Sequence, residues 1–129
     1  MSVSGAWKGM RRRPGRLVDT SFLATLVESP RGMIHGMIEE EDPEAGTIYA
    51  SVEGHRRGEM VIFVATVENP SPEQRPIQFI GMAAPGDGAV KGTWILATTI
   101  RGDRYGEFEM EKLAQGVAEA SETPVFEPV

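Results

Sequence analysis

The chain has 129 residues, the size of one ordinary domain, of which 40% are hydrophobic and 25% are charged. These averages indicate neither a globally disordered chain nor a membrane protein, and a formal net charge of -6 disfavours a general attraction to nucleic acid or to a membrane surface. The chain has no cysteine, so disulfides are excluded and we expect a cytoplasmic protein.

Apolar and polar residues alternate with a period of two along most of the chain, which is typical of β-strands. Clusters of turn residues, among them SPRG, DPEAG and APGDG, interrupt the alternation and separate eight predicted strands. In chain order, we predict strands at Gly5–Arg13, Thr20–Glu28, Met33–Glu41, Thr47–Arg56, Glu59–Glu68, Pro76–Ala83, Ala89–Thr99 and Tyr105–Leu113. The connections are short, so each strand is expected to pair with the next one in an antiparallel meander.

Closing this meander into a barrel would remove the two free edges of the sheet. We therefore predict an all-β fold, a single eight-stranded antiparallel up-and-down (meander) β-barrel formed by residues 1–113. Such a barrel is just wide enough to be filled by side chains or to hold one small ligand. The acidic segment 114–129 is expected either to be a mobile tail or to dock on the barrel through Val125 and Phe126.

The parity of each strand predicts which side chains point into the barrel. In the last strand, for example, Phe108 and Met110 lie on the opposite face from Glu107 and Glu109. The inward face also has a layer of glycine and alanine, at positions 9, 24, 36, 50, 65, 81 and 92. This layer is compatible with a filled barrel and equally with a cavity for a small hydrophobic ligand. The expected lining of such a cavity is Trp7, Ile38, Phe63, Phe79, Trp94 and Phe108.

The fifth predicted strand breaks the alternation, because both of its faces are apolar from Met60 to Ala65. The next two strands partly continue this double-sided pattern. Contiguous exposed apolar surfaces usually mark interfaces, so we expect the protein to associate with itself as a dimer or a tetramer. The alternative is that a helix or the C-terminal tail covers the surface. The expected interface residues are Met60, Ile62, Val64, Ile80 and Ile95.

Three segments resemble strands of the avidin and streptavidin type of barrel, within the wider group that includes lipocalins and fatty-acid-binding proteins. GAW at residues 5–7 is similar to the glycine-x-tryptophan that opens the first strand in these families. GMIHGMI at 32–38 resembles their glycine-rich third strand, and VKGTWILATT at 90–99 resembles the seventh avidin strand, in which a tryptophan walls the biotin site. The resemblance extends over residues 5–113 and implies a meander barrel with a ligand site beside Trp94.

The polar residues of the family's biotin site are missing from this chain. Residues 8–10, Lys-Gly-Met, stand where the family has a polar contact to the ureido group, and Ile38 stands in place of a tyrosine. Phe63 and Ala65 stand where the family has a tryptophan and a run of hydroxyl side chains. A buried ureido group without its polar partners loses several kcal/mol, so we predict no tight biotin binding.

The charged clusters and histidines are expected to be solvated. The arginines within 11–16 and the acidic run 39–42 are interpreted as strand ends at the surface. His35 is predicted to lie on the outer face across from Ser51 and Glu53, and His55 to lie in a turn. This arrangement predicts no metal site, and no motif calls for a cofactor.

Three functions are compatible with these features. We favour a non-catalytic barrel that binds a small hydrophobic ligand in its interior and forms homo-oligomers. The first alternative is a protein interaction or scaffold module with a filled core. The second is an enzyme, an isomerase or hydratase acting on an apolar substrate, which the lack of a pair of inward-facing titratable groups in the sequence pattern disfavours.

Overall fold

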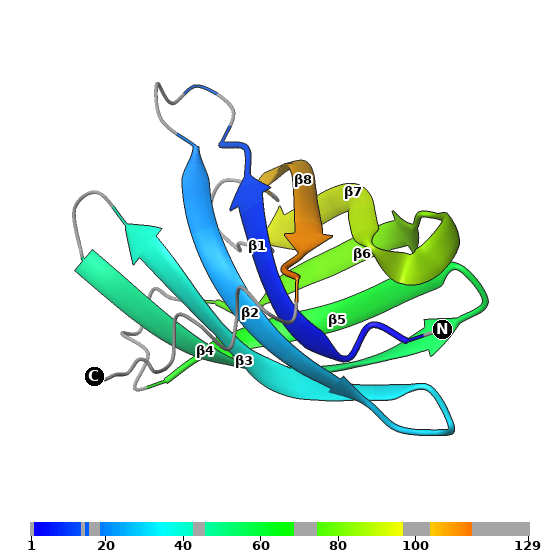
Figure 1. Ribbon diagram of the computed structural model, residues 1–129. Helices are drawn as coiled ribbons and strands as arrows, with labels where there is room; N and C mark the ends of the chain where they lie inside the picture. The colour runs from blue at the N-terminus through cyan, green and yellow to red at the C-terminus, as the bar shows by residue number, and fades with distance from the viewer. Residues whose placement is uncertain are drawn as a thin grey trace.

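The computed structural model describes residues 2–13, 15, 19–42, 46–68, 75–96 and 104–114. These residues form eight antiparallel strands that close into one barrel, with each strand paired to its neighbours in chain order and β1 paired to β8 (Figure 1). The strands are β1 Gly5–Arg11, β2 Thr20–Glu28, β3 Met33–Asp42, β4 Gly46–Arg57, β5 Met60–Val67, β6 Ile77–Ala83, β7 Ala89–Leu96 and β8 Arg104–Lys112. A short 3-10 helix, η1 Pro85–Asp87, connects β6 to β7. The predicted all-β meander barrel is confirmed.

The strand boundaries differ from the predicted ones by a few residues. β1 ends at Arg11 instead of Arg13, although the Arg12 amide still donates a backbone hydrogen bond to Glu107 O. β6 begins one residue later than predicted, at Ile77, because the preceding Pro76 has no N–H to give to the ladder. The predicted end of β7 at residues 97–99 and the tail at 115–129 lie outside the described residues.

The pairing register keeps the predicted inward residues together. Phe79 lies opposite both Phe63 on β5 and Trp94 on β7, and Gly92 lies opposite Phe108 on β8. Because side chains alternate along each strand, this register collects the apolar side chains on the inside of the closed sheet.

Four phenylalanine rings fill the middle of the barrel. Phe63 and Phe79 are stacked with ring centroids 4.8 Å apart, and Phe108 meets Phe79 edge-on at 5.0 Å. Phe22 meets Phe79 edge-on as well, at 6.0 Å. A Cβ atom placed on Gly9 would lie 2.3 Å from the Phe22 ring, so the absence of a side chain there makes room for the aromatic ring. Gly9, and likewise Gly81 beside the Phe108 ring, therefore accommodate phenylalanine side chains in the core.

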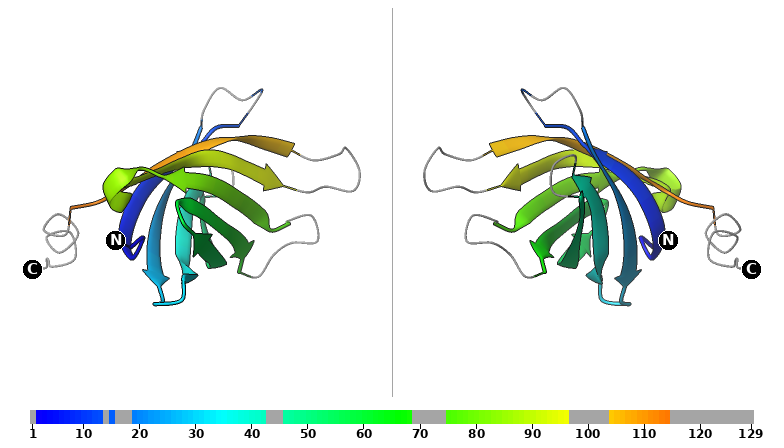
Figure 2. Two further views of the ribbon diagram at one scale, coloured as in Figure 1. Left: turned by 90° about the vertical axis from the view of Figure 1, so that its right-hand side faces the viewer. Right: turned by 90° about the vertical axis from the view of Figure 1, so that its left-hand side faces the viewer.

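The two ends of the barrel are built differently. We call the end that contains the N-terminal segment and η1 the sealed end, and the end where β1, β3 and β7 finish the open end (Figure 1, Figure 2). At the sealed end, Val3 and Val90 are completely buried. The open end contains the pocket described below.

Candidate functional site

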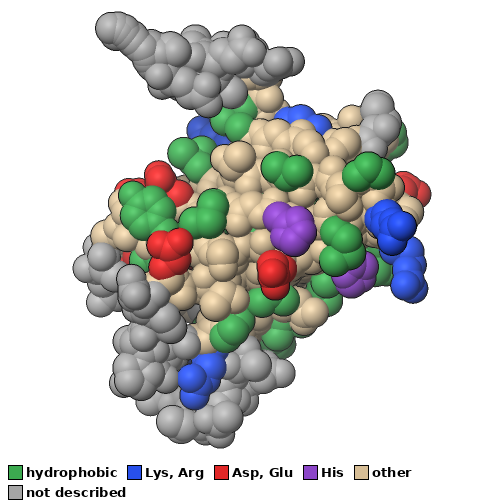
Figure 3. All heavy atoms as spheres, turned by 90° about the horizontal axis from the view of Figure 1, so that it is seen from below, with side chains coloured by type: hydrophobic (Ala, Val, Ile, Leu, Met, Phe, Trp, Pro, Cys, Tyr) green, Lys and Arg blue, Asp and Glu red, His purple; other side chains and the backbone are tan. Residues whose placement is uncertain are grey.

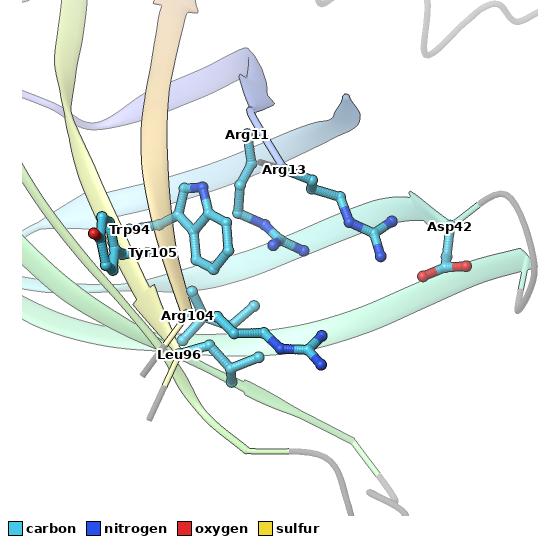
Figure 4. Close-up of a pocket in the computed structure, with 8 residues that line it drawn as sticks. Arg11, Arg13, Asp42, Trp94, Leu96, Arg104 and Tyr105 are labelled. Carbon is cyan, nitrogen blue, oxygen red and sulfur yellow. The ribbon is translucent and has the colours of Figure 1, made fainter. Parts of the chain in front are cut away.

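A pocket of about 600 Å³ lies at the open end of the barrel (Figure 4). Its volume falls within the range of small-molecule sites, which runs from about 300 to 1,000 Å³. Five strands, β1, β3, β6, β7 and β8, and one residue that follows β1 contribute to it. The lining residues are Arg11, Arg13, Asp42, Ile77, Trp94, Leu96, Arg104 and Tyr105.

Trp94 forms part of the floor of this pocket and is held on several sides. Its indole Nε1 donates a hydrogen bond of 2.7 Å to Arg12 O, and the Arg11 guanidinium carbon lies 4.6 Å from the ring centroid. A Cβ atom on Gly106 would lie 2.7 Å from Nε1, so a glycine is needed beside the ring. Trp94 is 3% exposed, so packing on nearly all sides fixes the position of its ring at the edge of the pocket.

Arg11 and Glu40 form a two-point ion pair beside Trp94. Arg11 Nε donates to Glu40 Oε2 at 3.1 Å, and Nη2 donates to Oε1 at 3.0 Å. The two side chains are 10% and 12% exposed. The expectation that both belong to solvated strand ends is wrong. Both residues have inward parity, on β1 and β3, so their charged groups lie close together inside the open end.

Three other charged residues line the same pocket. Arg13 follows β1 by two residues, Asp42 ends β3 and Arg104 begins β8, all at positions of inward parity. In Figure 4, the guanidinium groups of Arg13 and Arg104 extend into the pocket, whereas Tyr105 points to the other side of its strand. Ile77 and Leu96 supply an apolar wall. The pocket thus combines an apolar surface with a charged rim.

The six side chains predicted to line a ligand cavity lie at three levels of the barrel. Trp94 lines the open-end pocket, whereas Phe63, Phe79 and Phe108 belong to the aromatic cluster beneath it. Ile38 is buried in the core at 1% exposure. Trp7 lies near the sealed end, where its Nε1 donates a 2.9 Å hydrogen bond to Val3 O.

Sequence reasoning missed Arg13 and Arg104 as pocket residues, and it interpreted the run that contains Arg11 as solvated. Inward parity could have identified Arg11 and Arg13, because both follow Trp7 at even spacing along the same strand and its extension. Arg104 shares the parity of Phe108, which was predicted to point inward. The parity of the sequence therefore indicated that these arginines point inward. The run of arginines was interpreted from its charge and not from the position of each residue in its strand.

A second ion pair, Arg56 with Asp87, lies at the sealed end. The Arg56 guanidinium donates to both Asp87 carboxylate oxygens, at 2.7 and 2.8 Å, and its Nη1 lies 3.6 Å from Glu28 Oε1. These hydrogen bonds lower the pKa of Asp87 below its ordinary value and raise the pKa of Arg56. Glu28 Oε1 also accepts a hydrogen bond from the Val3 amide. This network fastens the N-terminal segment and η1 to the end of β4.

The outer wall contains the residues predicted to form an oligomer interface. Met60 is 40% exposed, and Ile62, Val64, Ile80 and Ile95 are partly exposed. Ile62 pairs with Ile80 across β5 and β6, so the two form one continuous surface.

Apolar side chains are also exposed on other strands of this wall. The strongly exposed ones outside β5 include Leu23, Val27, Met33, Met37 and Met82. Figure 3 shows apolar side chains around both histidines on the lower face of the barrel.

The histidines do not lie in the pocket. His35 pairs with Glu53 on the outside of β3 and β4, which confirms the predicted cross-strand arrangement. His55 lies within β4 and not in a turn, because this strand continues to Arg57. Within the described ranges, no group of three or more histidine or acidic side chains is arranged to hold a metal ion. None of the helices in these ranges is long and apolar enough to cross a membrane.

Comparison of the chain with protein-family models, with curated proteins and with solved structures finds no match. The closed antiparallel meander of eight strands is consistent with a calycin-like fold.

Proposed function

We propose that the protein is a non-catalytic barrel, related in architecture to the avidin and streptavidin type, that binds a small and largely apolar molecule at its open end. The observation that carries this proposal is the pocket of about 600 Å³ above the fixed indole of Trp94. Ile77 and Leu96 extend the apolar surface on one side. A concave apolar surface with a few polar groups at its rim is the usual form of a small-molecule site.

The ligand is assigned to the open end and not to the centre of the barrel. The central space is occupied by four phenylalanine rings in mutual contact, of which Phe63 and Phe79 are completely buried. A central ligand would have to displace these packed rings, which is costly in a core at normal density. The open end requires no such displacement.

A neutral fluorescent probe, N-phenyl-1-naphthylamine, tests the proposal, because its emission increases in apolar surroundings. We expect saturable binding to the wild-type protein and at least tenfold weaker binding to Leu96→Asp, since a carboxylate on the apolar wall would have to be desolvated. Val27→Asp, on the outer wall and 59% exposed, is the matched control and should bind the probe normally. Equal binding by both variants, or no saturable binding to the wild type, would contradict the proposal.

A second proposed function is self-association through the outer wall of β5–β7. It is supported by the paired Ile62 and Ile80 and by Met60, which lies opposite the exposed Met82. Sedimentation velocity should show a dimer or tetramer that Ile80→Lys converts to a monomer. Leu23→Lys, at an exposed apolar position on β2, should leave the assembly intact. A wild-type protein that stays monomeric at high concentration would contradict self-association.

The isomerase or hydratase alternative remains a hypothesis. Contrary to the sequence prediction, the interior contains a pair of titratable groups, because Glu40 and Asp42 both have inward parity at the open end. Glu40, however, accepts two hydrogen bonds from Arg11, which leaves it poorly suited to abstract a proton. We therefore keep the non-catalytic proposal.

A further inference from the structure

The inward-facing positions of the barrel change character at the open end. In the middle they include four phenylalanines, whereas at the open end three arginines and two acidic residues stand beside the apolar Ile77 and Leu96. These charged residues are Arg11, Arg13, Glu40, Asp42 and Arg104. Charges that point inward at the end of a barrel are costly to desolvate, and they commonly mark a place where a charged group is bound.

The described residues at the open end carry a local excess of positive charge. Among them, three guanidinium groups face two carboxylates, which leaves one unit of positive charge however these groups are paired. This excess contrasts with the whole chain, whose formal net charge is -6. Attraction of an anion to this end must therefore come from the local arginines, since the protein as a whole repels anions.

Arg11 and the other two arginines have different positions in the pocket. Arg11 donates through Nε and Nη2 to both carboxylate oxygens of Glu40, which neutralises it in the floor of the pocket. Arg13 Nη1 lies 3.5 Å from Thr20 Oγ1, at the limit of a hydrogen bond, and Arg104 is exposed at the rim. Figure 4 shows the guanidinium groups of Arg13 and Arg104 on the pocket side of their strands. These two groups can reach an incoming anion.

We propose that the ligand of the open end is an amphipathic anion, a compact hydrocarbon that carries a single carboxylate or sulfonate. Its apolar body would rest against Leu96 and Ile77, and its acidic group would accept hydrogen bonds from Arg13 and Arg104. Guanidinium groups suit such an acid because their planar donors match two oxygens at once. This inference rests on the proposed ligand-binding function and adds the charge of the ligand to it.

Two probes that differ by one sulfonate test the inference. 1-Anilinonaphthalene-8-sulfonate has the same aromatic skeleton as the neutral N-phenyl-1-naphthylamine. We expect the sulfonate to bind the wild-type protein about tenfold more tightly than the neutral probe, as a charge-assisted hydrogen bond would provide. Added salt should weaken binding of the sulfonate and leave the neutral probe unaffected.

The double variant Arg13→Gln/Arg104→Gln should remove the preference for the sulfonate while the neutral probe still binds. Arg104→Gln alone, at an exposed position, provides a variant whose folding is not at risk and should lose part of the preference. Arg57→Gln, at an exposed arginine near the sealed end, is the matched control and should retain the full preference.

The outcomes separate this inference from the proposed function. Saturable binding of the neutral probe, with no preference for the sulfonate or with a preference that survives the double variant, would overturn the anionic ligand and leave the binding function intact. Failure of both probes to bind would overturn both proposals. A sulfonate that binds Leu96→Asp as tightly as the wild type would show attachment to the outer wall, which also overturns the inference.

Discussion

The two ends of the barrel use the same arrangement of a tryptophan and a cation, but the tryptophan of the open end lines a pocket, whereas the tryptophan of the sealed end is completely buried. At the sealed end, Trp7 donates to a backbone carbonyl, and Lys112 Nζ lies 5.4 Å from its ring centroid. At the open end, Trp94 also donates to a backbone carbonyl, and the Arg11 guanidinium carbon lies 4.6 Å from its ring. Each indole is therefore fixed by one hydrogen bond and one charged neighbour.

The ion pairs at the two ends are also similar. Arg56 donates to both oxygens of Asp87 at the sealed end, and Arg11 donates to both oxygens of Glu40 at the open end. The two ion pairs differ in the segment that holds the carboxylate. Asp87 belongs to η1, which closes over the sealed end. Glu40, in contrast, lies on a strand that lines the mouth. The same paired charges thus fasten a cover at one end and form the base of a pocket at the other.

The largest effect should come from Phe79→Ala, because this ring separates the two ends. Phe79 contacts three other phenylalanine rings and is completely buried. The loss of buried surface together with the cavity left behind should lower the free energy of unfolding by about 3–5 kcal/mol, measured by urea denaturation. Phe79→Leu, which retains much of the volume, should cost about 1.5 kcal/mol. An alanine variant as stable as the leucine variant would contradict a filled centre.

At the sealed end, Asp87→Asn should lower the free energy of unfolding by about 2–3 kcal/mol, because it leaves Arg56 without its carboxylate partner. Asparagine keeps the shape of the side chain and tolerates the positive φ of 56° at this position. Chemical denaturation measures the loss, and Glu109→Gln on the exposed outer face of β8 is the control. The variant should bind the probes at the open end normally, and weakened probe binding would contradict the independence of the two ends.

The stability difference between the wild type and Asp87→Asn should depend on pH. Hydrogen bonds from Arg56 lower the folded-state pKa of Asp87 below its ordinary value of 3.8. A carboxyl with a lowered folded-state pKa stabilises the fold above its unfolded pKa, and this contribution is lost as the pH falls through the folded-state pKa. The difference should therefore be full at about pH 6 and should shrink below about pH 4. A difference that stayed constant down to acid unfolding would contradict the role of the ionised carboxylate.

At the open end, Glu40→Gln should destabilise the fold less than Asp87→Asn does. It should also strengthen binding of the anionic probe. We expect a loss of about 1–2 kcal/mol, because Arg11 loses its partner close to the pocket, where water can partly compensate. Removing one of the two negative charges should also tighten binding of 1-anilinonaphthalene-8-sulfonate about threefold to tenfold. Fluorescence titration measures this gain, and weaker binding by the variant would contradict the assigned charge balance.

The smallest effect should be the heat signal on titration of the protein with biotin. No saturable binding in the submicromolar range is expected by calorimetric titration, because Ile38 has no polar group with which to hold the ureido moiety. Tight biotin binding would show that the open end resembles the avidin site more closely than its residues suggest.

The candidate site was predictable in part. Trp94 was correctly expected to face inward beside a glycine on the same face, and parity alone is enough for that conclusion because it is a local property of an extended chain. Arg11 was interpreted as solvated because it belongs to a run of arginines. Its burial depends on Glu40, which is 29 residues away in the sequence and is brought near by the pairing of β1 with β2 and of β2 with β3.

The alternation of residues, taken alone, determined the eight strands, their antiparallel order and the inward set, because each is a consequence of a two-residue period and short connections. The tertiary structure decided how the interior is used. Closure of the barrel and the register of its strands bring the phenylalanine rings together over Gly9 and Gly81. Closure and register also place Trp7 and Trp94 at opposite ends of the barrel. Whether an inward residue becomes core, cover or pocket depends on the neighbouring strands that reach the same level of the barrel, and a single strand's pattern does not contain that information.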